Sequence, residues 1–332
     1  MDPLELVQLA RTLIDIESTS GYESVASRWI SSWLSERGYR VVEQPVAVDR
    51  FNIVATLGEP DVILSTHIDC VPPFFPSHEK DGKLYGRGSC DAKGILAAQV
   101  AALERLRISG EHRVGLLVVV GEERGSQGAR VANEIAPGSR YLINGEPTDN
   151  RLGAATRGVY RVRLRATGRA AHSSHPELGE SAIEKILDAL VALRSVTLPK
   201  DDQLGQTYYT VGLISGGVAP NVVPPSAEAE LNFRTVGPAS EIRASLEPLC
   251  DMVALEDVIV VPPVVLTTVD GFEKEVFPFT TDIPFLPAWG KPLLIGPGSV
   301  LVAHTDDEHV DIADLLESVD HYETLAHTLL ET

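Results

Sequence analysis

The sequence is poor in cysteine. Among 332 residues there are only three, Cys70, Cys90 and Cys250, and no two of them form a CxxC pair. An odd count without paired spacing argues against a disulfide framework and against a zinc site built from thiolates. We expect reduced cysteines that are mostly buried.

Long apolar runs and excess positive charge are also missing. A helix needs about 20 apolar residues to cross a bilayer, and no stretch approaches that length. The start, MDPLELVQLARTLIDI, lacks the basic flank of a signal peptide. The 28 Lys and Arg face 47 Asp and Glu, a formal charge of −19 that would repel phosphate backbones and anionic lipid. We therefore expect a cytoplasmic protein without nucleic-acid or membrane partners.

The first part of the chain alternates helix and strand patterns. Its length predicts two domains. Residues 61–65 (DVILS) and 114–120 (VGLLVVV) are short apolar runs rich in β-branched residues, as in buried parallel strands. Further helices are predicted at 4–16, 24–37 and 92–108, and further strands at 40–45, 52–57 and 141–144. This order predicts an α/β domain with a mostly parallel sheet and helices on both faces.

The pattern changes near Thr156. Residues 159–167 (VYRVRLRAT) alternate apolar side chains with Arg, which predicts an antiparallel strand with one wet face. Helices at 181–193 and 239–252 and strands at 208–214, 227–236 and 258–261 complete an inserted α+β domain. The chain then returns to the first domain with a strand at 291–295 and a helix at 312–330. We assign residues 1–156 and 267–332 to a catalytic domain and 157–266 to a lid or dimerisation domain.

Acidic and imidazole side chains follow the predicted strands. His67 and Asp69 come after the first apolar run, Glu122 and Glu123 after the second, and Glu146 after the third. Open α/β sheets bind ligands beyond the carboxyl ends of their strands, so these side chains can converge. Histidine and carboxylate without thiolate suit a catalytic zinc site, and also cobalt or manganese.

Spacing separates the roles of neighbouring side chains. His67 and Asp69 share one face of an extended segment, so Asp69 is expected to accept a hydrogen bond from His67 rather than to bind metal. Glu122 and Glu123 point to opposite sides of an extended chain, which lets one bind metal while the other holds water. A metal lowers the pKa of bound water toward about 7, and a nearby carboxylate removes its proton. Each element alone is also typical of a solvated turn, and their order carries the information.

That order resembles a known family. The motifs HxD, GRGxxDxKG, GEE, GEPT, GxxAHSSxP, NVVP and GPGxxxxAHTxDE follow one another along nearly the whole chain. They resemble the co-catalytic zinc amidohydrolases that include acetylornithine deacetylase, succinyl-diaminopimelate desuccinylase, aminoacylase and glutamate carboxypeptidase.

The resemblance implies two divalent metal ions, expected to be zinc. It assigns His67 and Glu146 to one ion, Glu123 and His304 to the other, and Asp91 as a bridge between them. Glu122 is implied as the general base and later proton donor. The peptide bond after Asp91 is expected to be cis.

The inserted domain resembles the family's lid or dimerisation domain and implies a homodimer. Its His172 is expected to stabilise the tetrahedral oxyanion, often across the dimer interface, and His175 is the weaker candidate. Asn221 and Arg234 fall on positions that contact substrate, and the guanidinium can bind an α-carboxylate in bidentate fashion. Alternatively, Asn221 shapes a turn and Arg234 forms a salt bridge on its strand.

Two departures from the family pattern concern the site. The tract 266–290 is shorter than in most relatives, which usually have a helix before the residues that match Thr281 and Asp282. Cys70 and Cys90 stand beside the metal residues, either as packing residues or as a cause of sensitivity to oxidation or to soft metals.

The leading hypothesis is hydrolysis of the amide bond of an N-acyl amino acid. Residues 145–148 (GEPT) resemble the deacetylases of acetylornithine and acetyl-lysine more than the carboxypeptidases. The alternative is a dipeptidase or carboxypeptidase that uses the same site. A third interpretation is a non-catalytic, metal-dependent binding protein. Glu122 argues against it, because a pure binding site does not need an additional base beside Glu123.

Overall fold

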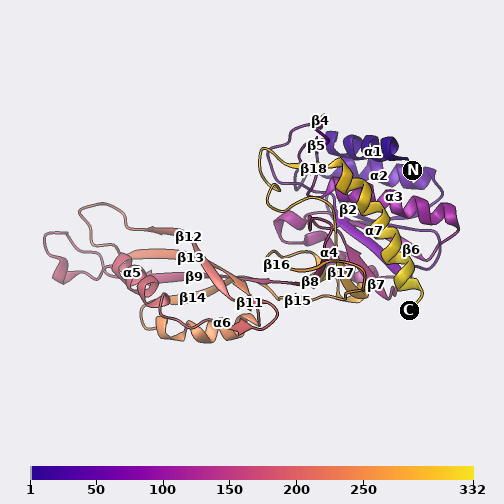
Figure 1. Ribbon diagram of the computed structural model, residues 1–332. Helices are drawn as coiled ribbons and strands as arrows, with labels where there is room; N and C mark the ends of the chain where they lie inside the picture. The colour runs from indigo at the N-terminus through magenta and orange to yellow at the C-terminus, as the bar shows by residue number, and fades with distance from the viewer. Residues whose placement is uncertain (1) are drawn as a thin grey trace. The chain divides into compact units, whose positions relative to one another are not determined.

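The computed structural model describes residues 2–332, which form two compact units (Figure 1). The first unit comprises the chain up to Ala154 together with Leu266–Glu275 and Thr281–Thr332. The second comprises Ala155–Val265 and the short segment Val276–Thr280. Among the described residues, no helix combines the length and the apolar character needed to cross a membrane.

A six-stranded sheet forms the centre of the first unit, in the order β1-β2-β6-β3-β7-β17. Its strands are β1 (Arg40–Ala47), β2 (Arg50–Thr56), β3 (Val62–His67), β6 (Val114–Val119), β7 (Tyr141–Asn144) and β17 (Lys291–Leu294). The last four in this list run parallel, whereas β1 and β2 pair antiparallel at one edge. The mostly parallel sheet predicted from the apolar runs is confirmed.

Helices cover both faces of this sheet. They are α1 (Pro3–Asp15), α2 (Ser24–Glu36), α3 (Lys93–Ser109), α4 (Gln127–Ala132) and α7 (Ile312–Leu330). Leu116 and Val118 of β6 enter the core that contains α1, α2, α3 and α7, whereas Leu117 and Val119 enter the core that contains α4. This alternation follows from the two-residue period of a strand. Figure 1 shows α7 (yellow) along one face of the sheet.

The second unit contains a four-stranded antiparallel sheet in the order β12-β13-β9-β14. Its strands are β9 (Gly158–Thr167), β12 (Tyr208–Gly216), β13 (Ser226–Thr235) and β14 (Ala254–Val261). Helices α5 (Ala182–Leu193) and α6 (Ala239–Ser245) pack with the apolar residues of β9. The arginines of β9 pair instead with glutamates of the neighbouring strands. β9 therefore has one face toward solvent and one buried face, as the alternation predicted.

One predicted helix is shorter than expected. The sequence predicted helix over 239–252, but α6 ends at Ser245 and a 3₁₀ turn, Glu247–Leu249, follows. Pro248 lies in that turn, and proline in a helix interior removes a backbone donor and clashes with the preceding turn. Pro248 therefore explains why α6 ends earlier than predicted.

Several short strands escaped the sequence analysis. β4 (His78–Lys80), β5 (Lys83–Tyr85) and β18 (His309–Asp311) form a sheet in the order β18-β5-β4. Further small sheets consist of β8 (Leu152–Thr156) with β15 (Val264–Val265) and β16 (Lys274–Phe277), and of β10 (Lys200–Asp201) with β11 (Gly205–Gln206). The pairing of His309 with Tyr85 places the segment after His304 beside the loop that leads to Asp91.

Candidate metal centre

The candidate site lies in the first unit, where three parallel strands end. β3 ends at His67, which is in register with Val119 at the end of β6, and Ser65 is in register with Asn144 at the end of β7. The loops after these ends contribute Glu122, Glu123 and Glu146. Parallel strands deliver their carboxyl ends to one edge of the sheet, so side chains remote in sequence meet there.

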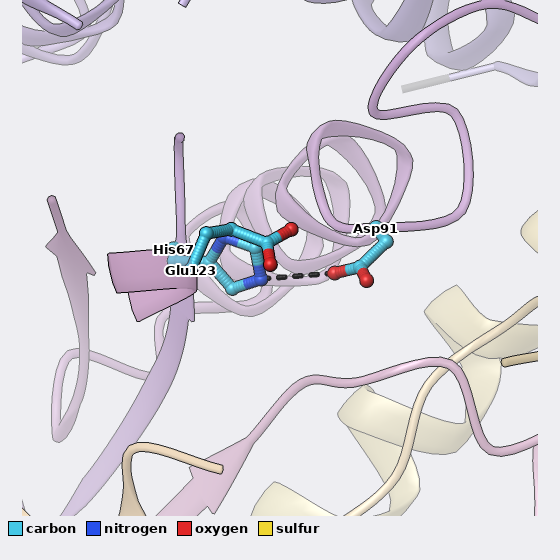
Figure 2. A group of neighbouring side chains, drawn as sticks. All are labelled: His67, Asp91 and Glu123. Carbon is cyan, nitrogen blue, oxygen red and sulfur yellow. Dashed lines mark hydrogen bonds and ion pairs between the residues drawn. The ribbon is translucent and has the colours of Figure 1, made fainter. Parts of the chain in front are cut away.

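A chain of four side chains forms the centre of the site. The Nε2 atom of His67 lies 3.0 Å from Oδ1 of Asp91, whose Oδ2 lies 3.2 Å from Nε2 of His304. The same His304 nitrogen lies 2.9 Å from Oε1 of Glu123. Ligand atoms of His67, Asp91 and Glu123 all lie within 4.8 Å of one another (Figure 2). Asp91 therefore has one carboxylate oxygen toward each imidazole, and its peptide bond to Ala92 is cis, as the resemblance implied.

The two histidines and Asp91 stabilise one another's charged forms. Contacts with Asp91 and then Glu123 raise the pKa of His304 to about 10. Burial disfavours the charged form of His67, but Asp69 and Asp91 outweigh burial and raise its pKa. Burial also disfavours ionisation of Asp91, yet the hydrogen bonds from His304 and His67 lower its pKa well below the usual range.

The remaining carboxyls are crowded. Burial raises the pKa of Glu122 well above its usual range, and the negative charges of Asp282 and Glu146 raise it further. Burial likewise raises the pKa of Glu123 and of Glu146, which is 6% exposed. Carboxyls packed in this way retain protons unless positive charge compensates them. Divalent cations would supply such compensation.

Asp69 makes hydrogen bonds that hold His67, Glu122 and Glu123 in place. The Nδ1 atom of His67 lies 2.9 Å from the backbone oxygen of Asp69 and 3.6 Å from its carboxylate. That carboxylate accepts hydrogen bonds from the backbone N–H groups of Glu122 and Glu123, at 3.0 and 3.3 Å, and from the hydroxyl of Ser20 at 2.7 Å. Asp69 thus orients His67 mainly through its carbonyl, and its carboxylate anchors the two glutamates.

The conformation of the glutamate pair differs from the prediction. Glu122 and Glu123 were expected to lie in an extended chain, but they begin a 3₁₀ turn, Glu122–Arg124. Gly121 precedes the turn with a φ of 75°, which only glycine adopts readily. The tight turn exposes both amides to Asp69, and this tertiary contact overrides the extended path expected after a strand.

Two further acidic residues belong to the neighbourhood and were given no role in the sequence analysis. Asp282 is 1% exposed, its Oδ1 has no hydrogen-bond partner among the described residues, and burial raises its pKa to about 6. Glu308 is fully buried and accepts a hydrogen bond from the backbone N–H of Asp91. The signal for both was present, since Asp282 stands in the apolar segment FTTDIPF and Glu308 ends the motif that contains His304.

Two cysteines lie close to the site as buried thiols. Burial raises the pKa of Cys70 to about 12 and raises that of Cys90 as well. Both side chains are at most 1% exposed. Reactivity requires an accessible thiolate, so this environment favours the packing role over sensitivity to oxidation.

The candidate substrate residues lie in the second unit. His172 is exposed, and its Nδ1 accepts a hydrogen bond from the backbone N–H of Ser174 at 3.2 Å. The neighbouring Ser173 N–H donates to the backbone oxygen of Asn221 at 3.0 Å, so these two segments lie side by side. His175 is exposed and contacts Glu177.

Arg234 lies on β13 without an acidic partner. It is half-buried, and burial lowers the pKa of its guanidinium. Among the described residues no carboxylate lies within 4.0 Å of it, since the salt bridges of this sheet involve other arginines. The salt-bridge alternative for Arg234 is therefore not what the structure contains.

Comparison with known proteins identifies relatives across the whole chain. Residues 63–328 match the model of peptidase family M20/M25/M40. A peptidase M20 domain-containing protein of Schizosaccharomyces pombe is 37% identical over 334 residues, which cover 96% of this chain and 84% of the relative. A probable carboxypeptidase of Aspergillus clavatus is 36% identical over 375 residues, which cover 98% of this chain and 83% of the relative.

Solved structures share the fold. Aminopeptidase PepT from Bacillus cereus superposes with a TM-score of 0.83 at 19% identity, covering 99% of both chains. A dinuclear metal binding peptidase of the M20 family from Bacillus subtilis gives a TM-score of 0.75 at 15% identity, again over 99% of both chains. The family match and the identity to the fungal relatives agree with the motif order, and the chain belongs to peptidase family M20/M25/M40.

Proposed function

We propose that the first unit binds two divalent metal ions through His67, Asp91, Glu123, Glu146 and His304. The donor set supports this, because imidazole and carboxylate without thiolate suit zinc, and also cobalt or manganese. The crowding of buried carboxyls with raised pKa values supports it as well. Asp91 has one oxygen toward each imidazole, as a bridging ligand would.

The proposed reaction is hydrolysis of an amide bond. Bound divalent ions would polarise the scissile carbonyl and increase the acidity of a water molecule. Glu122 would accept the proton of that water and later deliver it to the leaving amine. Burial raises its pKa above that of an ordinary carboxyl, which favours acceptance of the proton, and its backbone N–H donates to Asp69. The observation that carries the proposal is the contact chain from His67 through Asp91 and His304 to Glu123, with Glu122 as an additional carboxylate in the same turn.

Residues of the second unit would recognise the substrate. The Ser174 N–H donates to Nδ1 of His172, and an Nε2–H of this imidazole would then be available as a donor to the substrate. That N–H would stabilise the negative charge that develops on the carbonyl oxygen. Arg234, a guanidinium without a carboxylate partner, would bind the substrate's α-carboxylate, and Asn221 would contact the substrate near His172. A homodimer formed through this unit and a cytoplasmic location remain predictions.

Between the two candidate activities, we prefer the carboxypeptidase over the deacylase. Relatives with 33 to 37% identity are named probable carboxypeptidases, which favours removal of a C-terminal residue from a peptide. Hydrolysis of an N-acyl amino acid such as N-acetylornithine is the second candidate, supported by GEPT at 145–148. Both substrates present a free α-carboxylate on the amine side of the scissile amide.

A product assay separates these reactions. The metal-loaded protein would be incubated with N-acyl amino acids, N-blocked dipeptides and unblocked dipeptides, and released carboxylate and amino acid would be quantified. A carboxypeptidase cleaves N-blocked dipeptides, a dipeptidase requires the free amine, and a deacylase acts on the acyl amino acids. Absence of turnover on all three classes by protein that contains two metal equivalents would refute the proposal.

A further inference from the structure

Two residues of the recognised motifs have no role in the proposed reaction. Arg87 belongs to the segment GRGSCDAKG, and Glu308 lies four residues after His304. They form an ion pair with 2.5 Å between Nη1 and Oε2, and the two residues are 1% and 0% exposed. A buried ion pair is costly to desolvate and is retained only with further hydrogen bonds.

The other carboxylate oxygen of Glu308 accepts hydrogen bonds from the loop before α3. Its Oε1 accepts backbone N–H groups from Gly88 at 2.9 Å, Cys90 at 3.3 Å and Asp91 at 3.2 Å. The backbone oxygen of Glu308 also accepts the N–H of Gly86 at 3.2 Å. The side chain of Glu308 thus accepts three backbone N–H groups of the loop that ends at Asp91.

Arg87 fixes the orientation of that carboxylate. Its Nε donates to the backbone oxygen of Pro73 at 3.1 Å, and its guanidinium lies over the ring of Phe75 at 5.0 Å. The loop has little room to take another path, because a Cβ at Gly88 would meet the sulfur of Cys70 at 2.7 Å. The pair therefore holds Oε1 toward the three amides within a closely packed surrounding.

We infer that Glu308, oriented by Arg87, is a positioning residue that fixes Asp91, the proposed shared ligand of the two ions, and ties its loop to the segment containing His304. The inference rests on the proposed metal site. Glu308 does not touch the imidazoles or the substrate in this role. It acts on two proposed ligands, on Asp91 through the backbone amides of its loop and on His304 through the three residues that separate the two.

The test is Glu308→Gln, which keeps the size of the side chain but removes its charge. Metal-free protein would be titrated with Co²⁺ and with Zn²⁺ by calorimetry, and the visible absorption spectrum of the Co²⁺ form would be recorded. We expect the weaker site to lose roughly 10- to 100-fold in affinity, the range found when partners of metal ligands are removed. The Co²⁺ spectrum should change, and added metal should restore part of kcat, which it would not do for a purely structural defect.

Glu104→Gln provides a matched control. Glu104 is another buried carboxylate with an arginine partner, since Arg107 donates to it at 2.8 Å, and it lies on α3, which begins two residues after Asp91. This variant should lose stability but retain wild-type metal affinity and Co²⁺ spectrum. The same metal defect in both variants would mean that any buried charge loss disturbs the site, and would overturn the specific role of Glu308.

A double variant, Arg87→Met with Glu308→Gln, guards against misfolding, because it leaves no uncompensated buried charge. It should show the same loss of metal affinity. Wild-type affinity and spectrum in either folded variant would overturn the inference while the proposed function stands. If the wild-type protein itself bound no metal, the proposed function and the inference would fail together.

Discussion

At the scale of single residues, Glu122 provides the sharpest test of chemistry. Its carboxyl lies among Asp282, Glu146 and Glu123, and no metal-binding role is assigned to it. Glu122→Gln should keep metal stoichiometry but lower kcat by about 10²- to 10⁴-fold, because an amide cannot accept the proton of water. Metal content and steady-state kinetics measure this, with the exposed Glu134→Gln as a control. An unchanged kcat would remove the role of general base.

Asp282 offers a second residue-scale prediction, on pH dependence. Burial is the largest cause of the raised pKa of Glu122, and the negative charge of Asp282 is the next largest. Asp282→Asn removes that charge, so the pKa of Glu122 should fall and the deprotonated base should persist to lower pH. The acid limb of the kcat/KM profile should therefore move to lower pH. A limb that stays in place or moves to higher pH would show that Asp282 does not act on Glu122.

At the scale of elements, α3 links the site to the hydrophobic core. Almost every residue from Lys93 to Leu106 is buried, so the helix is fixed on all sides, and it begins two residues after Asp91. Near its end, Glu104 accepts hydrogen bonds from Arg107 and from Tyr39 at 2.8 Å each. Burial disfavours ionisation of Glu104, but Arg107 and Tyr39 outweigh it and lower the pKa below 4.5.

This lowered pKa gives a stability prediction. A carboxyl with a depressed folded-state pKa stabilises the protein fully above its unfolded pKa, and the contribution is lost as pH falls through the folded pKa. Glu104→Gln should therefore cost about 1 to 3 kcal/mol at neutral pH. The difference from wild type should shrink as the pH falls below 4.5. Denaturant unfolding of both proteins at neutral pH and below pH 4.5 measures this difference in stability. A difference independent of pH would contradict the role of the ionised form.

At the scale of the whole molecule, charge couples metal binding to folding. The chain has a formal charge of −19, and the site packs several buried carboxyls together. Chelation should lower the melting temperature, because a ligand present at 100 times its Kd stabilises the folded state by about 2.7 kcal/mol. Thermal melts with chelator and after zinc is restored measure this. An identical melting curve in both states would contradict the proposed cation site.

The sequence by itself determined the fold class and the order of the motifs. The runs at 61–65 and 114–120 predicted buried parallel strands because only apolar, β-branched residues fill such positions. The polar residues that follow them predicted one site because parallel strands end at one edge. The meeting of His67 and Glu123 was accessible to this reasoning, because strand direction and side-chain chemistry are local properties. Asp91 and His304 were predicted instead from the resemblance of the motif order.

Only the tertiary structure decided how the site is supported. The 3₁₀ turn at Glu122 exists because Asp69, 53 residues earlier in the chain, accepts its backbone N–H. Glu308 reaches the amides near Asp91 from 217 residues away, and Asp282 joins the carboxyls although its segment is remote in sequence from the strand ends that supply them. Periodicity reports which face of an element is buried, but it has no information on which distant polar group will satisfy a buried amide. That choice depends on how the packed elements meet.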